Sequence, residues 1–373
     1  MKVTGIICEL NPPHAGHRRL FDFARREDGR ALIAVMSGNF VQRGEPAVFS
    51  KHSRASAALE AGIDLVIELP VPYALSSAEG FASAAVGILR LTGIVDTLAF
   101  GAECGDIALL RRAALALELP ECGEMIRGEM MRGTSYARAC QIALGNILGD
   151  DAKVLEAPNN MLAIQYLRAL RDTDIDAVCL KREPGISASG IRSALRAGEK
   201  RNMLPAGDIP YGKPMFPENL EIAMLSRIRA LPESAFYETP GSSDGIAERA
   251  MRFSKSAGSA EELAFEIKTK RHTLSRVRRY LMCLALGVTD EHPALPPYAR
   301  VLGVNETGRA LLKSMDAALP VITKPADGRE IGGAVSKLLE LEAASTDFYN
   351  LGHTSPELRA GGAEWRISPA VKK

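Results

Sequence analysis

The feature that most constrains the fold is a short apolar run, Val3–Ile7, that leads directly into the segment Cys8–His17. This segment contains two prolines, which favour a bend, and then His14 and His17 on either side of Gly16. A helical pattern follows, so the order predicts a buried strand, a turn and a helix. A helix N-terminus presents unpaired N–H groups and partial positive charge, and the two imidazoles add donors there. The unit is therefore suited to bind a phosphate, as in enzymes that act on the α-phosphate of a nucleoside triphosphate.

The composition is that of an ordinary globular protein. The chain has 373 residues, of which 46% are hydrophobic and 24% charged, and its formal net charge is +1. The six cysteines have no metal-site spacing, which favours reduced thiols and a cytoplasmic location. No secretory signal is recognised, and no apolar run reaches the ~18 residues that suggest a membrane span.

The first half of the chain alternates strand patterns with helix patterns, which predicts an α/β fold with a Rossmann-like parallel sheet buried on both faces. The expected strands are Val3–Cys8, Ala31–Met36, Asp64–Leu69, Thr97–Phe100 and Asp176–Leu180. The expected helices are Gly16–Arg26, Lys51–Ala61, Ala78–Leu91, Asp106–Leu117, Thr134–Leu144, Met161–Asp172 and Ser189–Ala197.

Unusual residues gather where four of these strands end. They are His14–His17, Ser37–Asn39, Gly101–Asp106 and Lys181–Arg182. In parallel sheets ligands bind beyond the carboxyl ends of the strands, so this edge is the expected site.

The texture changes near residue 200, where glycines and prolines mark a link. We therefore expect two domains, a nucleotidyltransferase-like catalytic domain over 1–200 and a mainly α-helical domain over 201–373. The clearest later helices are Glu261–Lys270 and Leu274–Leu286. Between Lys268 and Arg279 the chain carries seven basic side chains and no acid. This segment is either a solvated helix face or a surface for RNA.

A second motif, Ile186–Arg192, places Ser187 and Ser189 with Arg192 at the start of an apolar helix. It has two interpretations. The serines either cap the helix, or the helix start holds the β- and γ-phosphates while Arg192 neutralises the leaving pyrophosphate.

The histidine turn and this second motif together resemble the HIGH-type nucleotidyltransferase superfamily. Further blocks resemble one family within it, the bacterial tRNA(Met) cytidine acetate ligases, over nearly the whole chain and in the same order. These blocks are Met36–Ala47, Asp64–Pro70, Phe100–Glu103, Pro158–Leu162, Lys270–Thr273, Arg300–Gly303 and Thr346–Tyr349. The chain departs from the family at Pro13 and Ala15, and in the short link Glu183–Gly185.

The resemblance implies an ATP-dependent ligase. Acetate and ATP would give acetyl-adenylate and pyrophosphate, and the acetyl group would pass to N4 of the wobble cytidine of elongator tRNA(Met). Mg²⁺ is expected with ATP, no metal site is expected in the protein, and no obligate protein partner or membrane is indicated.

The resemblance also implies roles for single residues. The expected catalytic residues are His14, His17, Ser187, Ser189 and Arg192. The expected ATP-binding residues are Ile7, Cys8, Glu9, Leu10, Asn11, Pro12, Pro13, His14, Ala15, Gly16, His17, Arg18, Arg19, Leu20, Gly101, Asn160 and Arg182. The expected tRNA-binding residues are Lys268, Lys270, Arg271, Arg276, Arg278 and Arg279, with Arg276 and Arg279 on one helix face.

Some assignments stay open at this point. Asn39, Gln42 and Arg43 either line the acetate or cytosine pocket or form a polar loop. Asp106 either meets the nucleotide or caps the helix after it. The alternative function is a nucleotidyltransferase that adenylylates a small phosphorylated metabolite. An aminoacyl-tRNA synthetase relative and an RNA-binding protein with a relict nucleotide fold are less favoured.

Overall fold

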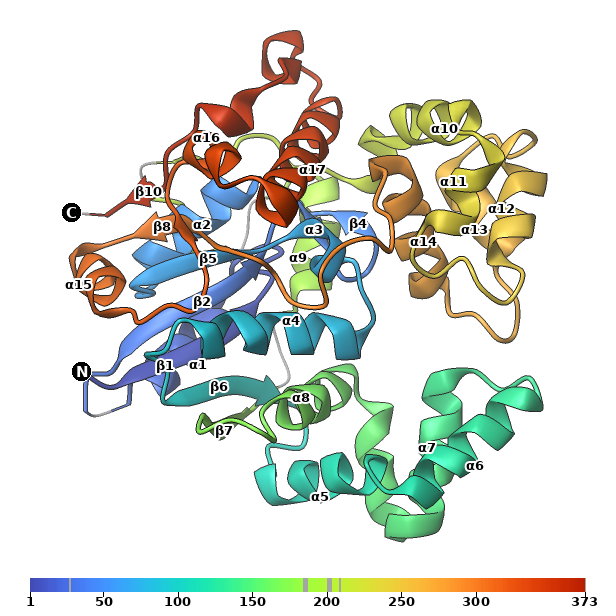
Figure 1. The fold of residues 1–373 in the computed structure, drawn as a ribbon, viewed down its shortest axis with the longest axis horizontal. Helices are drawn as coiled ribbons and strands as arrows, with labels where there is room; N and C mark the ends of the chain where they lie inside the picture. Colours follow the sequence, from blue (N-terminus) through green and yellow to red (C-terminus); the bar gives the residue numbers. More distant parts are fainter. Residues whose placement is uncertain (27, 184–186, 200–202, 208, 373) are drawn as a thin grey trace.

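The centre of the protein is a twisted sheet. The computed structural model describes residues 1–372 apart from 27, 184–186, 200–202 and 208. Eight strands form the sheet in the order β10-β8-β5-β2-β1-β6-β7, with β9 paired to β8 (Figure 1). They are β1 (Val3–Cys8), β2 (Ala31–Ser37), β5 (Leu65–Leu69), β6 (Thr97–Ala102), β7 (Asp176–Lys181), β8 (Ala299–Val304), β9 (Val321–Ile322) and β10 (Ala370–Val371).

The five strands predicted from the sequence are the five strands β5-β2-β1-β6-β7, and they run parallel as expected. Branched apolar side chains fill both faces, which is what a parallel sheet between two helix layers requires. One face packs against α1 (Ala15–Arg25) and α2 (Lys51–Glu60), and the other against α4 (Ala78–Leu91) and α8 (Pro158–Ala169). The α/β fold class is confirmed.

The remaining elements of the first half extend this unit. They are the hairpin β3 (Phe40–Val41) and β4 (Glu45–Pro46) and the helices α3 (Val71–Ala74), α5 (Ile107–Leu117), α6 (Pro120–Met131), α7 (Tyr136–Leu148) and α9 (Ala188–Arg196), with a 3₁₀ segment at Gly149–Glu156. The α6 helix was not among the predicted elements, and the prediction began α7 two residues too early.

A second lobe follows residue 217 and has its own buried core. Its helices are α10 (Glu221–Ala230), α11 (Glu233–Glu238), α12 (Ile246–Ser254), α13 (Ala260–Ile267) and α14 (Leu274–Leu286). The expected inward side chains Val277 and Leu281 are buried in this core. The helical nature predicted for this stretch is confirmed.

The chain then returns to the sheet, which corrects the predicted boundary. The β8 strand pairs antiparallel with β5, and β10 pairs with β8, so residues 299–304 and 370–371 belong to the first unit rather than to a separate domain 201–373. The reason is that β5 would otherwise be an open edge, and β8 supplies its hydrogen-bond partners. The other returning elements are α15 (Glu306–Ser314), α16 (Pro325–Gly328) and α17 (Gly333–Asn350).

A buried ionic cluster fastens the returning segment to the sheet. The Lys51 ammonium lies 2.6 Å from Glu68 and 2.5 Å from Glu364, and the Arg300 guanidinium lies 2.9 Å from Glu68. Burial opposes ionisation of Glu68, but Lys51 and Arg300 lower its pKa to about 2. Burial and the neighbouring Glu68 raise the pKa of Glu342 to about 7, because this carboxyl has a weaker share of the cations. Charged pairs thus join β5, α2, β8 and the C-terminal segment.

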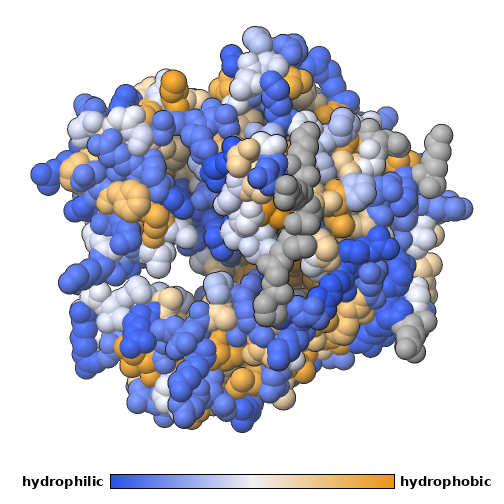
Figure 2. Space-filling view, turned by 180° about the vertical axis from the view of Figure 1, so that it is seen from behind, coloured by the Kyte–Doolittle hydropathy of each residue, from blue (hydrophilic) through white to orange (hydrophobic). Residues whose placement is uncertain are grey.

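Two lobes flank the carboxyl ends of the central strands. The α10–α14 lobe lies on one side and the α5–α7 helices on the other, and the surface is hollowed between them (Figures 1 and 2). Within the described residues, no helix is long and apolar enough to cross a membrane.

Candidate active site

The turn between β1 and α1 presents the two histidines as predicted. His14 is the N-cap of α1, and its Nδ1 accepts a hydrogen bond from the Gly16 N–H at 3.1 Å. The Nδ1 of His17 accepts a hydrogen bond from the His14 N–H at 3.2 Å. The two rings lie side by side, with centroids 3.9 Å apart. Both imidazoles are therefore held by the first turn of the helix.

These hydrogen bonds fix the protonation of the pair. An Nδ1 that accepts a hydrogen bond carries no proton, so each neutral ring has its proton on Nε2. Burial, assisted by the Arg182 guanidinium, lowers the pKa of His14 to about 4. Burial, His14 and Arg182 hold the pKa of His17 well below its usual range. At neutral pH the site thus offers two Nε2–H donors without cationic charge.

The low pKa of His14 predicts an acid-sensitive site. The unfolded chain takes up a proton at this residue near pH 6.5, whereas the folded protein does so only near pH 4. Stability from this group is therefore complete above pH 6.5 and is lost as the pH falls from there towards 4. We expect His14→Asn, which keeps an acceptor but does not titrate, to lose less unfolding free energy than the wild type between pH 7 and 5. Urea titrations at both values measure this, and equal losses would refute it.

The second motif meets the first one directly. Arg192 on α9 donates from its guanidinium to the Asn11 carbonyl at 2.7 Å, so the helix that follows β7 is tied to the histidine turn. Ser187 caps α9 by accepting from the Gly190 N–H at 3.1 Å, and its hydroxyl lies 3.0 Å from that of Ser189. The capping role is confirmed for Ser187, and the phosphate role of both serines stays a prediction. Residue 186, the first of the motif, and 184–185 of the short link lie outside the described residues.

Gly101 and Arg182 lie next to each other on β6 and just beyond β7. A Cβ at position 101 would stand 3.4 Å from the Arg182 side chain, so the glycine leaves room for the arginine stem. Arg182 is also close enough to both histidines to lower their pKa values. The structure thus brings together four residues that lie far apart in the sequence.

Asn160 has a different place from the one expected of a ligand contact. Its side chain is buried, accepts from the Cys104 N–H at 3.1 Å and donates to the Val154 carbonyl at 3.0 Å. The Glu103 carboxylate accepts from the Asn160 N–H at 3.0 Å. The side chain of Asn160 therefore positions the loop after β6. Asp106 caps α5 through the Leu109 N–H, which confirms the capping interpretation.

The other residues of the predicted ATP-binding segment divide by exposure. Buried side chains are those of Ile7, Cys8, Leu10, Asn11, Pro12 and Pro13, so a nucleotide can reach this part only through the backbone or after rearrangement. Arg18 pairs with Asp22, and Arg19 pairs with Glu183 across the site. Ala15 and Gly16 are exposed at the helix start, where an anion can approach closely.

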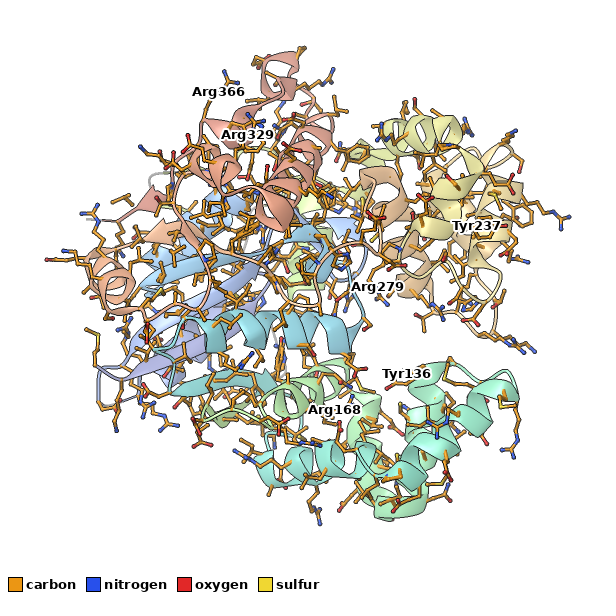
Figure 3. All side chains as sticks on the ribbon, viewed as in Figure 1. Tyr136, Arg168, Tyr237, Arg279, Arg329 and Arg366 are labelled. Carbon is orange, nitrogen blue, oxygen red and sulfur yellow. The ribbon has the colours of Figure 1, made fainter. Side chains whose placement is uncertain are left out.

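Two arginines of the expected tRNA surface serve instead as internal connections. Arg278 lies 3.0 Å from Glu45 of the β3–β4 hairpin and 2.6 Å from Glu261. Arg279 donates to the Gln42 carbonyl at 3.4 Å and lies where α14 meets the α/β unit (Figure 3). Both guanidiniums therefore attach the helical lobe to the hairpin, and this engagement was not visible in the sequence because the partners lie more than 200 residues away.

The rest of the basic segment is more open. Lys268, Lys270 and Arg271 are exposed in the loop between α13 and α14. Arg276 is half-buried and paired with Asp244 at 3.0 Å, so it does not share an open face with Arg279 as expected. The exposed cations of the loop are the part of the predicted RNA surface that the structure leaves accessible.

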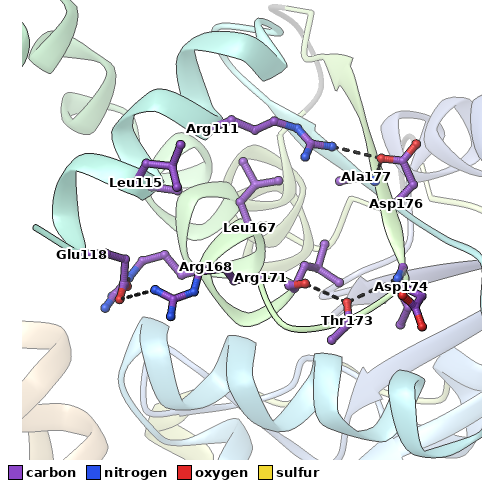
Figure 4. A pocket seen from close by; sticks show the side chains of 13 residues that line it. Arg111, Leu115, Glu118, Leu167, Arg168, Arg171, Thr173, Asp174, Asp176 and Ala177 are labelled. Carbon is purple, nitrogen blue, oxygen red and sulfur yellow. Dashed lines mark hydrogen bonds and ion pairs between the residues drawn. The ribbon is translucent and has the colours of Figure 1, made fainter.

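A pocket of about 430 Å³ lies elsewhere, between α5, the end of α8 and the start of β7 (Figure 4). Arg111 pairs there with Asp176, and Arg168 pairs with Glu118. Because β7 begins at this pocket, it lies at the opposite end of the strand from the histidine turn. We therefore assign it no part in the chemistry.

Comparison with known proteins agrees with this geometry. The sequence model of the family described as HIGH Nucleotidyl Transferase matches residues 1–363. The class of protein is thus a nucleotidyl transferase with a histidine-containing phosphate turn.

Relatives narrow the class. The tRNA(Met) cytidine acetate ligase of Acetivibrio thermocellus is 34% identical over 98% of each chain, and that of Syntrophomonas wolfei is 33% identical over 99% of each. The crystal structure of Thermotoga maritima TmcAL bound with alpha-thio ATP superposes with a TM-score of 0.90 at 32% identity, covering 100% of this chain and 99% of that one. The chain belongs to the tRNA(Met) cytidine acetate ligase family.

Proposed function

We propose that the protein activates acetate with ATP and acetylates N4 of the wobble cytidine of elongator tRNA(Met). In the first step an acetate oxygen attacks the α-phosphorus, the bond to the bridging oxygen of pyrophosphate breaks, and acetyl-adenylate forms. In the second step the cytosine amine attacks the acetyl carbonyl, loses a proton and displaces AMP. ATP and tRNA as substrates agree with the relatives' names and with the ATP analogue in the Thermotoga structure.

The observation that carries this proposal is the neutral histidine pair at the N-terminus of α1, joined through Asn11 to Arg192. The Nε2–H groups of His14 and His17 would donate to the α-phosphate as negative charge gathers on it. Donors held in place before the reaction need no reorganisation during it, which is the main source of such stabilisation. Arg192, with Arg182, would neutralise the departing pyrophosphate.

Mg²⁺ would arrive as the counter-ion of ATP. The described part of the chain contains no group of three or more His, Cys, Asp or Glu side chains placed to hold a metal. Mg²⁺ at nucleotide sites commonly relies on substrate phosphates and water, so the ion would enter and leave with the nucleotide as part of the substrate.

The RNA would approach through the hollow between the two lobes. Lys268, Lys270 and Arg271 are exposed on the α13–α14 loop of the helical lobe and would contact the RNA backbone. An anticodon loop already presents unpaired bases, so little unstacking is needed to bring a cytosine to the carboxyl ends of the strands.

The first step can be tested without RNA. Acetate should drive exchange of labelled pyrophosphate into ATP, because formation of acetyl-adenylate is reversible and yields pyrophosphate rather than phosphate. Other small acids and phosphorylated metabolites serve as comparison substrates. Exchange that depends on a phosphorylated metabolite and not on acetate would contradict the proposal.

A further inference from the structure

The β3–β4 hairpin covers the side of the histidine turn that faces away from Gly101 and Arg182. In the sheet β2 lies on one side of β1, and β6 and β7 lie on the other. Gly101 and Arg182 come from the β6–β7 side, whereas the hairpin follows β2 directly. The crevice beyond the strand ends thus has a nucleotide side and a second side roofed by the hairpin, where another substrate can lie beside the α-phosphate.

The backbone of Gln42 in this hairpin is fixed from both directions. Its N–H donates to the Glu9 carboxylate at 2.7 Å, and its carbonyl accepts from Arg279 at 3.4 Å. The next turn is equally constrained, since Gly44 has a φ of +77° and a Cβ there would stand 2.3 Å from the Arg279 backbone nitrogen. Gln42 is therefore held between the histidine turn and the helical lobe, independently of its side chain.

The side-chain amide of Gln42, by contrast, is unused. Its Nε2 is shielded from water and has no hydrogen-bond partner among the residues that the structure describes. A shielded donor without an acceptor is destabilising, and such groups are rare in native proteins. An acceptor supplied by a ligand would remove this cost.

The surroundings favour a small anion as that ligand. Glu9 beside Gln42 is buried, which raises its pKa, while the guanidiniums of Arg54, Arg43 and Arg192 act in the opposite direction. Three cations thus lie near one carboxylate, so this side of the turn has excess positive charge. A carboxylate ligand matches that charge and accepts hydrogen bonds readily.

We propose that the Gln42 amide binds the acetate, donating from Nε2 to the oxygen that does not attack phosphorus. This inference rests on the proposed function and adds the residue that holds the second substrate. With one oxygen bound to Gln42, the other is directed at the α-phosphorus. After adenylation the same amide faces the acetyl carbonyl oxygen, where negative charge develops as the cytosine amine attacks.

The test is Gln42→Met, which keeps the length of the side chain and removes the donor. In tRNA-free pyrophosphate exchange we expect the KM for acetate to rise about tenfold or more, as for loss of one hydrogen bond to a charged group. The KM for ATP should stay within about twofold of wild type. The thermal unfolding midpoint should be equal or higher, because the variant removes an unsatisfied donor and keeps both backbone hydrogen bonds. Gln141→Met on α7 is the matched control and should change neither constant.

The outcomes separate this inference from the proposed function. An unchanged KM for acetate in Gln42→Met, with an active wild type, would overturn the inference alone. A defect confined to transfer onto tRNA would also overturn it, since Gln42 would then face the cytosine. A lower unfolding midpoint would indicate a structural side chain and contradict it. If the wild type shows no acetate-dependent exchange at all, the proposed function itself fails.

Discussion

His17→Asn is expected to lower acetate-dependent pyrophosphate exchange by about 10²- to 10³-fold, the usual cost of removing one preorganised donor to a developing charge. Asparagine can place an acceptor near the position of Nδ1, which receives the His14 N–H in the wild type, but it has no atom at the position of Nε2. The variant should therefore fold normally and fail in catalysis. Exchange rates and thermal unfolding of the same preparation measure both.

Two companion variants sharpen this result. His17→Gln carries a donor near the position of Nε2 and should recover part of the activity. His292→Asn, at a histidine outside the candidate site, should leave exchange unchanged. Wild-type exchange in His17→Asn would remove the histidine from the phosphate site.

Reversing Lys268, Lys270 and Arg271 to glutamate is expected to weaken tRNA binding on the order of a hundredfold near 0.1 M salt. The dependence of affinity on salt should become shallower by about two to three contacts. Exchange without tRNA should stay at the wild-type rate, because these exposed side chains lie outside the candidate nucleotide site. Filter binding across a salt series, together with exchange rates, measures both effects.

The control makes the same change of charge elsewhere. Lys313, Lys324 and Lys337 are exposed on the returning segment, and their reversal should weaken tRNA binding far less. Equal losses in the two triple variants would mean that only net charge matters. Arg278 and Arg279 are unsuited to this test, because reversing them would also detach the β3–β4 hairpin.

The central half of the fold was predictable because its signals are local. The turn at His14 and the cap at Ser187 each depend on neighbours within a few residues, so the printed order of side chains contains the interaction. Strand patterns were equally clear, since strands buried on both faces are continuously apolar.

The return of the chain to the sheet was not predictable in the same way. Arg300 on β8 meets Glu68 on β5 across 232 positions, and nothing near either residue identifies its partner. A charge inside an apolar strand was a usable signal, because such a charge is buried only when it is paired. That signal indicates a partner but not where it lies, and the same limit applied to Arg279 and the hairpin.

The most direct test of the central claim is the fate of the acetyl carbon. Purified protein should be incubated with elongator tRNA(Met), ATP and isotopically labelled acetate, and the nuclease-digested tRNA analysed by mass spectrometry. We predict labelled N4-acetylcytidine at the wobble position, formed only with ATP and accompanied by AMP, and no label transfer from acetyl-CoA without ATP. An unmodified wobble cytidine under these conditions, or ATP-independent transfer from acetyl-CoA, would contradict the account.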